Sequence, residues 1–159
     1  MLKTNFNGID RRWMNRAIEL AKDAASRGEI PVGAVVVDKN GCVLGEGSNR
    51  REETKNTMAH AEIEAISAAC KKLNDWRLDD CTLYVTLEPC PMCAGAIINS
   101  RISTVVFGAF DLRAGSLESV VDLSRYPYES RPVVYGGIEE DECSSLLSNF
   151  FKAVRTQDE

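Results

Sequence analysis

The sequence predicts a three-layer α/β/α domain with a central mixed five-stranded sheet. Segments with helical spacing of apolar residues alternate with short β-branched runs along most of the chain. The first two runs flank a Lys-Asn-Gly turn and so predict an antiparallel hairpin, whereas the later runs are separated by helices and need crossover connections. Because no repeat, low-complexity tract or linker interrupts the 159 residues, we expect one domain spanning 1–159.

The first expected elements are a helix and the hairpin. Asp10 suits the N-cap of a helix from about Arg11 to Arg27, which Gly28 can end. Apolar residues recur on one side of this helix at Met14, Ala17, Ile18, Ala21 and Ala25. The hairpin strands then run from Val32 to Val37 and from Cys42 to Gly47.

Helices and strands alternate through the rest of the chain. The expected elements are a helix at about Ala59 to Leu73, a strand at Thr82 to Thr86, a helix at Met92 to Ser100, strands at Thr104 to Gly108 and Val133 to Tyr135, and a closing helix at Glu140 to Arg155. The closing helix carries Leu146, Leu147, Phe150, Phe151 and Val154 on or near one face. The stretch from Phe110 to Pro132 is the least periodic, and long loops are often functional, so we expect it to face a substrate.

Composition limits the classes of function. With 44% hydrophobic and 27% charged residues, the chain can form a complete core without disulfides or a structural metal. Neither a signal peptide nor a membrane-spanning run is evident, which predicts a cytoplasmic protein. The 19 basic residues are outnumbered by 24 acidic ones, which argues against broad electrostatic binding of nucleic acid but allows a local basic patch.

A candidate metal site combines the only histidine with a cysteine pair. His60 opens a His60-Ala61-Glu62 triplet, and Cys90 and Cys93 stand three residues apart at an expected helix start. That spacing places both sulfurs on one face, where unpaired backbone N–H groups stabilise thiolates. Catalytic zinc typically has three protein ligands and one water, and His60, Cys90 and Cys93 supply that number.

Glu62 is the candidate catalytic residue. Two thiolates and a neutral imidazole leave zinc with a net charge near zero, so its water is acidified less than in an all-histidine site and needs a nearby base. As general base, Glu62 would take the water's proton, and as general acid it would return protons to the ring nitrogen and the leaving amine. The plainer alternative is a carboxylate that stabilises the first turn of its helix.

Other interpretations of the metal residues stay open at this point. A redox cysteine pair would not account for the His-Ala-Glu triplet. A zinc-stabilised binding module without catalysis would need a fourth protein ligand, and iron can occupy similar sites. In a reducing compartment, the remaining cysteines are expected as buried or semi-buried thiols: Cys42, Cys70, Cys81 and Cys143.

The His-x-Glu and Pro-Cys-x-x-Cys strings form the known signature of zinc-dependent nucleobase deaminases, and the chain resembles the cytidine deaminase-like superfamily. Its longer strings resemble those of the bacterial tRNA adenosine deaminases from about Arg11 to Arg155. These strings are Glu29-Ile30-Pro31-Val32-Gly33-Ala34, Gly45-Glu46-Gly47-Ser48-Asn49-Arg50, Met58-Ala59-His60-Ala61-Glu62, Trp76-Arg77-Leu78 and Leu83-Tyr84-Val85-Thr86-Leu87-Glu88-Pro89-Cys90-Pro91-Met92-Cys93-Ala94-Gly95-Ala96.

The resemblance implies a homodimeric hydrolase with one zinc ion per subunit that converts the wobble adenosine of a tRNA anticodon to inosine. It also implies that Asn49 holds the target nucleoside, Val32 lines the base pocket, and Phe151 and Arg155 touch the anticodon loop. Without the resemblance, Asn49 is a turn residue, Phe151 a core residue and Arg155 a solvated residue.

The chain departs from the family pattern near the expected RNA surface. Glu118-Ser119 stands where the family often has Gly-Ser, Glu129-Ser130-Arg131 stands near the place of an Asn-His-Arg string, and Met58 replaces a common threonine. Arg50, Arg51 and Lys55 can form a small basic patch, although Glu52 and Glu53 lie among them. A deaminase of a free nucleobase or nucleoside, of guanine, cytosine or adenosine type, is therefore the alternative function.

Overall fold

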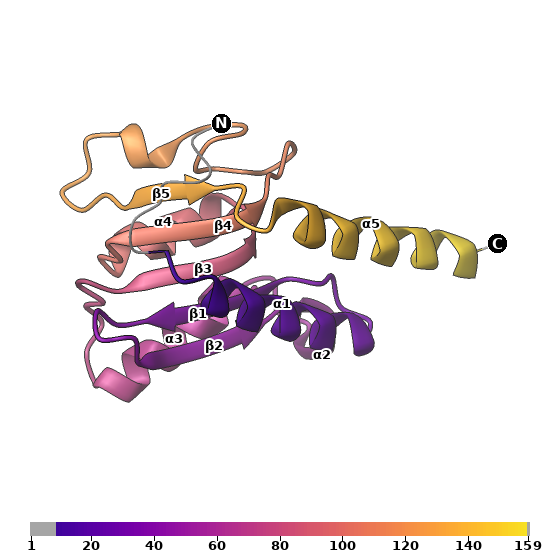
Figure 1. Ribbon diagram of the computed structural model, residues 1–159, viewed down its shortest axis with the longest axis horizontal. Coiled ribbons are helices and arrows are strands. Elements are labelled where there is room, and N and C mark those ends of the chain that lie inside the picture. Colours follow the sequence, from indigo (N-terminus) through magenta and orange to yellow (C-terminus); the bar gives the residue numbers. More distant parts are fainter. Residues whose placement is uncertain (1–8, 159) are drawn as a thin grey trace.

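The computed structural model describes residues 9–158 and contains one five-stranded sheet with the order β2-β1-β3-β4-β5 (Figure 1). Its strands are β1 (Gly33–Val37), β2 (Val43–Ser48), β3 (Thr82–Leu87), β4 (Thr104–Ala109) and β5 (Val133–Gly136). β1 pairs antiparallel with both β2 and β3, whereas β3, β4 and β5 run parallel. The predicted mixed sheet of five strands is confirmed.

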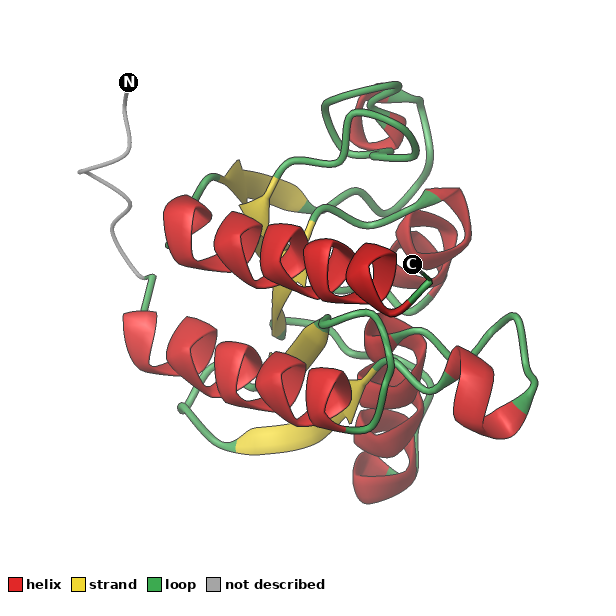
Figure 2. Cartoon of the chain, turned by 90° about the vertical axis from the view of Figure 1, so that its right-hand side faces the viewer, coloured by secondary structure: helices red, strands yellow, loops and turns green. Residues whose placement is uncertain are grey.

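Helices cover both faces of this sheet. α1 (Arg11–Ser26) and α5 (Glu140–Gln157) lie side by side over one face, and α3 (Ala61–Leu73) and α4 (Pro91–Asn99) lie over the other (Figure 2). Each face has its own apolar core. The predicted three-layer α/β/α architecture is therefore confirmed, and none of the described helices is long and apolar enough to cross a membrane.

α1 forms as its sequence predicts. The Asp10 side chain accepts a hydrogen bond from the Arg12 backbone N–H at 3.0 Å and so caps the helix. Met14 and Ala17 are fully buried, and Ala24 is buried where Ala25 was expected. The apolar face is thus rotated slightly at the end of the helix.

Two short helices were not predicted: α2 (Arg51–Thr54) and the 3₁₀ helix η1 (Leu123–Arg125). The residues of α2 form a mixed-charge run without apolar periodicity, and their helix depends on a distant partner. The buried carboxylate of Glu29 accepts the backbone N–H groups of Glu52 at 3.2 Å and Glu53 at 2.6 Å. α3 correspondingly begins at Ala61, two residues later than predicted.

The closing helix and one cysteine differ from expectation. Among the described residues of α5 only Cys143 is buried, and Phe151 and Val154 remain 42% and 38% exposed. The reason is visible in Figure 1, where the second half of α5 extends beyond the sheet. Cys42 is exposed beside the hairpin turn, so its expected burial is wrong, whereas desolvation by burial raises the pKa of Cys81 to about 11 and of Cys143 to about 12.

Strand direction brings distant segments to one edge of the sheet. Because β1 is antiparallel to its neighbours, its start lies beside the ends of β2 and β3, as the Gly33–Ser48 pairing shows. Val32, Asn49 and Glu88 therefore lie close together at this edge. Leu87 of β3 pairs with Ala109 of β4, so Asp111, which follows β4, lies next to them. α3 and α4 begin at this same edge.

Candidate active site

Two helix starts bring one imidazole and two thiols together. His60 is the N-cap of α3, Cys90 is the N-cap of α4, and Cys93 lies in the first turn of α4. The His60 Nδ1 lies 3.6 Å from the Cys90 Sγ and 3.5 Å from the Cys93 Sγ, and all three candidate ligand atoms lie within 4.8 Å of one another. Both sequence motifs therefore start helices, as predicted.

The three side chains fit a tetrahedral zinc ion. Zinc bonds of about 2.3 Å to sulfur and about 2.0–2.1 Å to nitrogen, opened by a tetrahedral angle, separate the two ligand atoms by about 3.6 Å. The nitrogen–sulfur distances of 3.5 and 3.6 Å agree with this separation. Mixed thiolate and imidazole donors also suit zinc chemically.

The two neighbouring thiols shift each other's pKa in opposite directions. A hydrogen bond from Cys93, with a further one from His60, lowers the pKa of Cys90 to about 4. The Cys90 hydrogen bond and burial raise the pKa of Cys93, because a second thiolate beside the first is unfavourable. A divalent cation would remove this penalty and release a proton on binding.

Glu62 lies beside this cluster in the first turn of α3. Its side chain is buried, with a relative exposure of 4%, and burial raises the pKa of its carboxyl group. A hydrogen bond from Cys93 acts in the opposite direction. A carboxyl group with a raised pKa is a stronger base than an ordinary carboxyl group and so accepts a proton more readily, which favours the catalytic interpretation over a purely structural one.

A cavity of about 160 Å³ opens in front of His60, Glu62 and Cys90. Val32 and Asn49, which were expected at the substrate, both line it. The buried Asn49 amide is only loosely held, since its Nδ2 donates to the Ile30 carbonyl at 3.5 Å and its Oδ1 accepts the Arg51 N–H at 3.3 Å. Asn49 is therefore both a turn residue and a polar group of the cavity wall.

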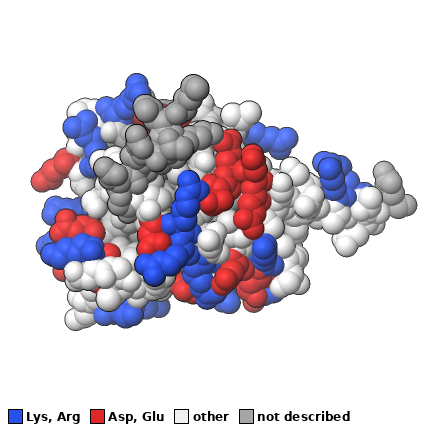
Figure 3. Space-filling view, in the orientation of Figure 1, with Lys and Arg blue, Asp and Glu red and all other residues white. Residues whose placement is uncertain are grey.

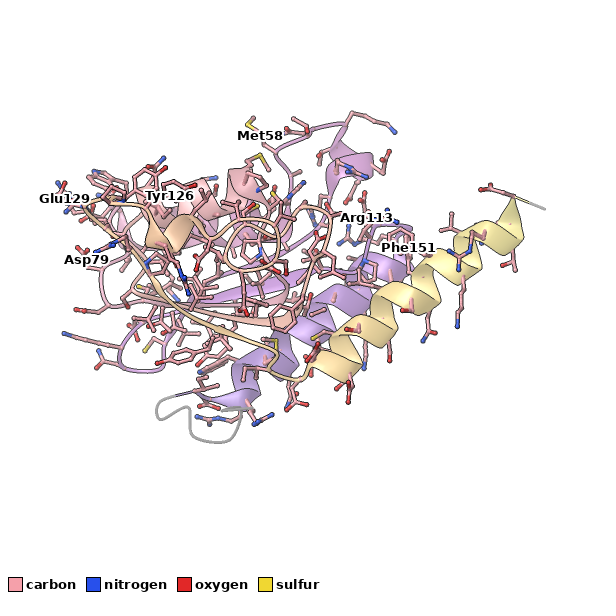
Figure 4. All side chains as sticks on the ribbon, turned by 90° about the horizontal axis from the view of Figure 1, so that it is seen from above. Met58, Asp79, Arg113, Tyr126, Glu129 and Phe151 are labelled. Atoms are coloured by element: carbon pink, nitrogen blue, oxygen red, sulfur yellow. The ribbon has the colours of Figure 1, made fainter. Side chains whose placement is uncertain are left out.

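Phe151 and Arg155 do not line this cavity. They belong to a neighbouring groove that also contains Leu112 and Arg113, and Figure 4 shows Arg113 and Phe151 next to each other. The cavity and the groove share Ile30, Leu87 and Asp111, so the two spaces adjoin. The exposure of Phe151 rules out the alternative that it is a core residue.

The sequence did not identify several residues of the cavity wall. These are Ile30, Leu87, Glu88, Asp111 and Ala114. Asp111 and Ala114 come from the aperiodic stretch that was expected to face a substrate, and that expectation gave the only available signal for them. Arg51, named only as part of a basic patch, also lines the cavity and lies close enough to His60 for its charge to oppose protonation of the imidazole.

Residues 9–155 match the MafB19-like deaminase family. The chain belongs to this deaminase family. A relative from Bacillus subtilis (strain 168), a tRNA-specific adenosine deaminase, is 46% identical over 149 residues, which cover 92% of this chain and 91% of the relative. A tRNA-specific adenosine deaminase of Aquifex aeolicus is 44% identical and covers 90% of this chain and 94% of its own length. The resemblance inferred from the motif strings is thus confirmed.

Solved structures of deaminases have the same fold. One comes from a study of A-to-I editing by tRNA:A34 deaminases at the wobble position of transfer RNA; its TM-score is 0.83 at 41% identity, over 87% of this chain and all of that chain. A guanine deaminase from Bacillus subtilis is also similar, with a TM-score of 0.63 and 35% identity over 80% of this chain and 83% of its own. This deaminase therefore has structural relatives with two kinds of substrate.

Proposed function

We propose that this deaminase converts the wobble adenosine of a tRNA anticodon to inosine by zinc-dependent hydrolysis, releasing ammonia. The observation that carries the proposal is Glu62 beside the His60, Cys90 and Cys93 cluster, at a cavity large enough for part of a nucleoside. The tRNA deaminase relatives favour RNA over a free base, because they exceed the guanine deaminase in both identity and structural similarity.

His60, Cys90 and Cys93 would hold the zinc, which when bound supplies an acidified water as the nucleophile. Glu62 would take the two protons of the attacking water one after the other, giving the first to the purine ring nitrogen and the second to the departing amine. Asn49 orients the nucleoside through its loosely held amide, and Val32 packs against the base. Burial of Glu62 maintains the raised pKa that this two-way transfer needs.

The adjoining groove suits single-stranded RNA. Phe151 and Leu112 provide exposed apolar surface, and Arg113 and Arg155 provide positive charge. An unstacked anticodon base can stack on such a surface while a neighbouring base enters the cavity. Glu118 is exposed, and Glu129 lies on the opposite side of the molecule from Arg113 and Phe151 (Figure 4). Neither glutamate lines the groove.

Ammonia release from a panel of substrates tests this function. We expect turnover of an anticodon stem-loop that carries adenosine at the wobble position, with inosine identified by mass spectrometry. Free guanine, cytosine, adenosine and cytidine serve as competing substrates. Turnover of free bases or nucleosides alone would replace the proposal with the alternative of a small-molecule deaminase.

Glu62→Ala tests the chemical step. Removal of the proton carrier should lower kcat by about 10²- to 10⁴-fold while zinc content, measured by metal analysis, stays near one ion per chain. Glu64→Ala is the matched control, because Glu64 lies in the same first turn of α3 but does not line the cavity. Unchanged turnover in Glu62→Ala would rule out the catalytic role and leave the first-turn carboxylate.

We also infer a homodimer, a single domain over 1–159 and a cytoplasmic location. Large apolar side chains that one chain leaves exposed support association, among them Met58, Trp76 and Val120. One continuous sheet with a core on each face supports the single domain. Light scattering of the purified protein should give twice the chain mass, and a monomeric mass would contradict the dimer.

A further inference from the structure

Glu88 is a buried carboxylate at the cavity wall that the proposed chemistry does not use. It follows β3 directly, stands two residues before Cys90 and is 1% exposed. The described hydrogen bonds of its side chain all come from the segment 111–119, which follows β4. The residue that follows β3 thereby holds a loop that begins more than twenty positions later in the sequence.

The loop uses the full acceptor capacity of this carboxylate. Oε1 accepts the Asp111 N–H at 3.1 Å and the Ser119 hydroxyl. Oε2 accepts the N–H groups of Leu117 at 3.3 Å, Glu118 at 2.9 Å and Ser119 at 2.9 Å. A carboxylate offers about four lone-pair sites, and five donors converge on this one, so no acceptor is left for a substrate.

The close packing of the loop also depends on Glu88. A Cβ added to Gly115 would collide with the Glu88 carboxylate, so a glycine is required where the chain passes over it. Leu117, in the same segment, is 2% exposed and packs into the core beneath. The segment is therefore fixed at two points, by the buried carboxylate and by the leucine.

This segment forms the boundary between the two substrate spaces. Asp111 lines both the cavity and the groove, Ala114 faces the cavity, and Leu112 and Arg113 face the groove. A shift of the segment would therefore change the base pocket and the RNA surface together.

We propose that Glu88 is the positioning residue that fixes segment 111–119 as the common wall of the base pocket and the RNA groove, and so sets the affinity for the RNA substrate. The proposal rests on the proposed function for its substrate. It also explains the Glu118-Ser119 string, because Glu118 contributes only its backbone N–H whereas Ser119 contributes both its N–H and its hydroxyl.

Glu88→Gln tests the proposal, because glutamine keeps the size of the side chain but turns one acceptor oxygen into an amide donor that faces the donors of the loop. We expect KM for the anticodon stem-loop to rise by about 10- to 100-fold, as expected when a binding surface is misplaced. Partial unfolding would lower the active fraction and the apparent kcat but leave KM unchanged. An unchanged KM would overturn the proposal.

Ser119→Ala removes one of the five donors and provides a milder variant if Glu88→Gln folds poorly. We expect a rise in KM of a few-fold, and the double variant should bind no worse than Glu88→Gln alone, because both changes act on one network. If the two substitutions raise KM by independent factors that multiply in the double variant, they do not act through one hydrogen-bond network, and the proposal is contradicted. Ser100→Ala is the control, since the buried Ser100 hydroxyl donates to the Ile97 carbonyl at the far end of α4, away from segment 111–119.

Hydrogen exchange followed by mass spectrometry separates this proposal from the proposed function. In Glu88→Gln, exchange should accelerate at the amides of Asp111, Leu117, Glu118 and Ser119 and stay unchanged in β1 and β2. This measurement needs no RNA. If the wild-type enzyme fails to deaminate the stem-loop, that result contradicts the proposed function but not the positioning role of Glu88. Unchanged exchange in 111–119 would remove the positioning role alone.

Discussion

At the scale of single residues, the ionisable groups divide into those that serve the site and those that serve the fold. Glu62 has a raised pKa because it is buried, whereas Asp10 has a lowered pKa because Arg12 hydrogen-bonds its carboxylate. The ionised form of Asp10 caps α1 and also accepts the Arg12 guanidinium. Opposite shifts in these two carboxyl groups reflect desolvation in one case and hydrogen bonding of the charged form in the other.

Asp10→Ala should destabilise the protein by about 1 kcal/mol at neutral pH through loss of the N-cap. The folded-state pKa of Asp10 lies below the ordinary value of 3.8, so its ionised form stabilises the folded state above pH 3.8. That contribution is lost as the pH falls through the lower, folded-state pKa. Urea unfolding of both proteins at several pH values checks this, and a difference that grows as the pH falls below 3.8 would contradict it.

At the scale of elements, close contact between helices and strands places the metal residues. Gly47 in β2 lies so near α3 that an added Cβ would collide with the backbone at Ala61 and Ala65. This contact fixes the start of α3, where His60 and Glu62 lie. By contrast, a Cβ added to Gly95 in α4 would meet nothing within 4 Å.

Gly47→Ala should lower the free energy of unfolding by about 1–3 kcal/mol, because α3 must move away from the sheet. Gly95→Ala is the matched control and should raise it by up to about 1 kcal/mol, because alanine favours the helical backbone. Urea unfolding monitored by circular dichroism measures both changes. Equal effects of the two substitutions would show that helix propensity and not close packing determines the outcome.

At the scale of the whole molecule, charged side chains are distributed and do not form one large basic or acidic patch on the described part of the face in Figure 3. The chain has a net charge of −5, and acidic and basic side chains are interspersed over the described part of the face in Figure 3. Binding of RNA must therefore depend on local cations such as Arg113 and Arg155 in the groove. The extension of α5 beyond the sheet is what brings Arg155 to that place.

Arg155→Ala and Arg113→Ala should each weaken binding of the stem-loop and reduce the slope of log affinity against log salt by about 0.7–0.9, the loss of one phosphate contact. Fluorescence anisotropy at several salt concentrations measures both quantities. Lys39→Ala is the control, since Lys39 lies in the hairpin turn at the opposite end of β1 from the site. An equal effect of Lys39→Ala would show that only net charge matters.

The sequence by itself determined the fold class and the cluster of His60, Cys90 and Cys93, because both can be inferred from patterns of neighbouring residues. Periodicity predicted the bounds of every strand and of the four long helices to within two residues, and the motifs predicted that His60, Cys90 and Cys93 lie at two helix starts. Only the tertiary structure decided the short helix α2, the ordered loop after β4 and the exposure of Phe151. Each of these depends on a partner far away in the chain: Glu29 for α2, Glu88 for the loop, and the limited length of the sheet beneath α5. Long-range hydrogen bonds and the edge of a packed layer leave no periodic signal in the residues that they position.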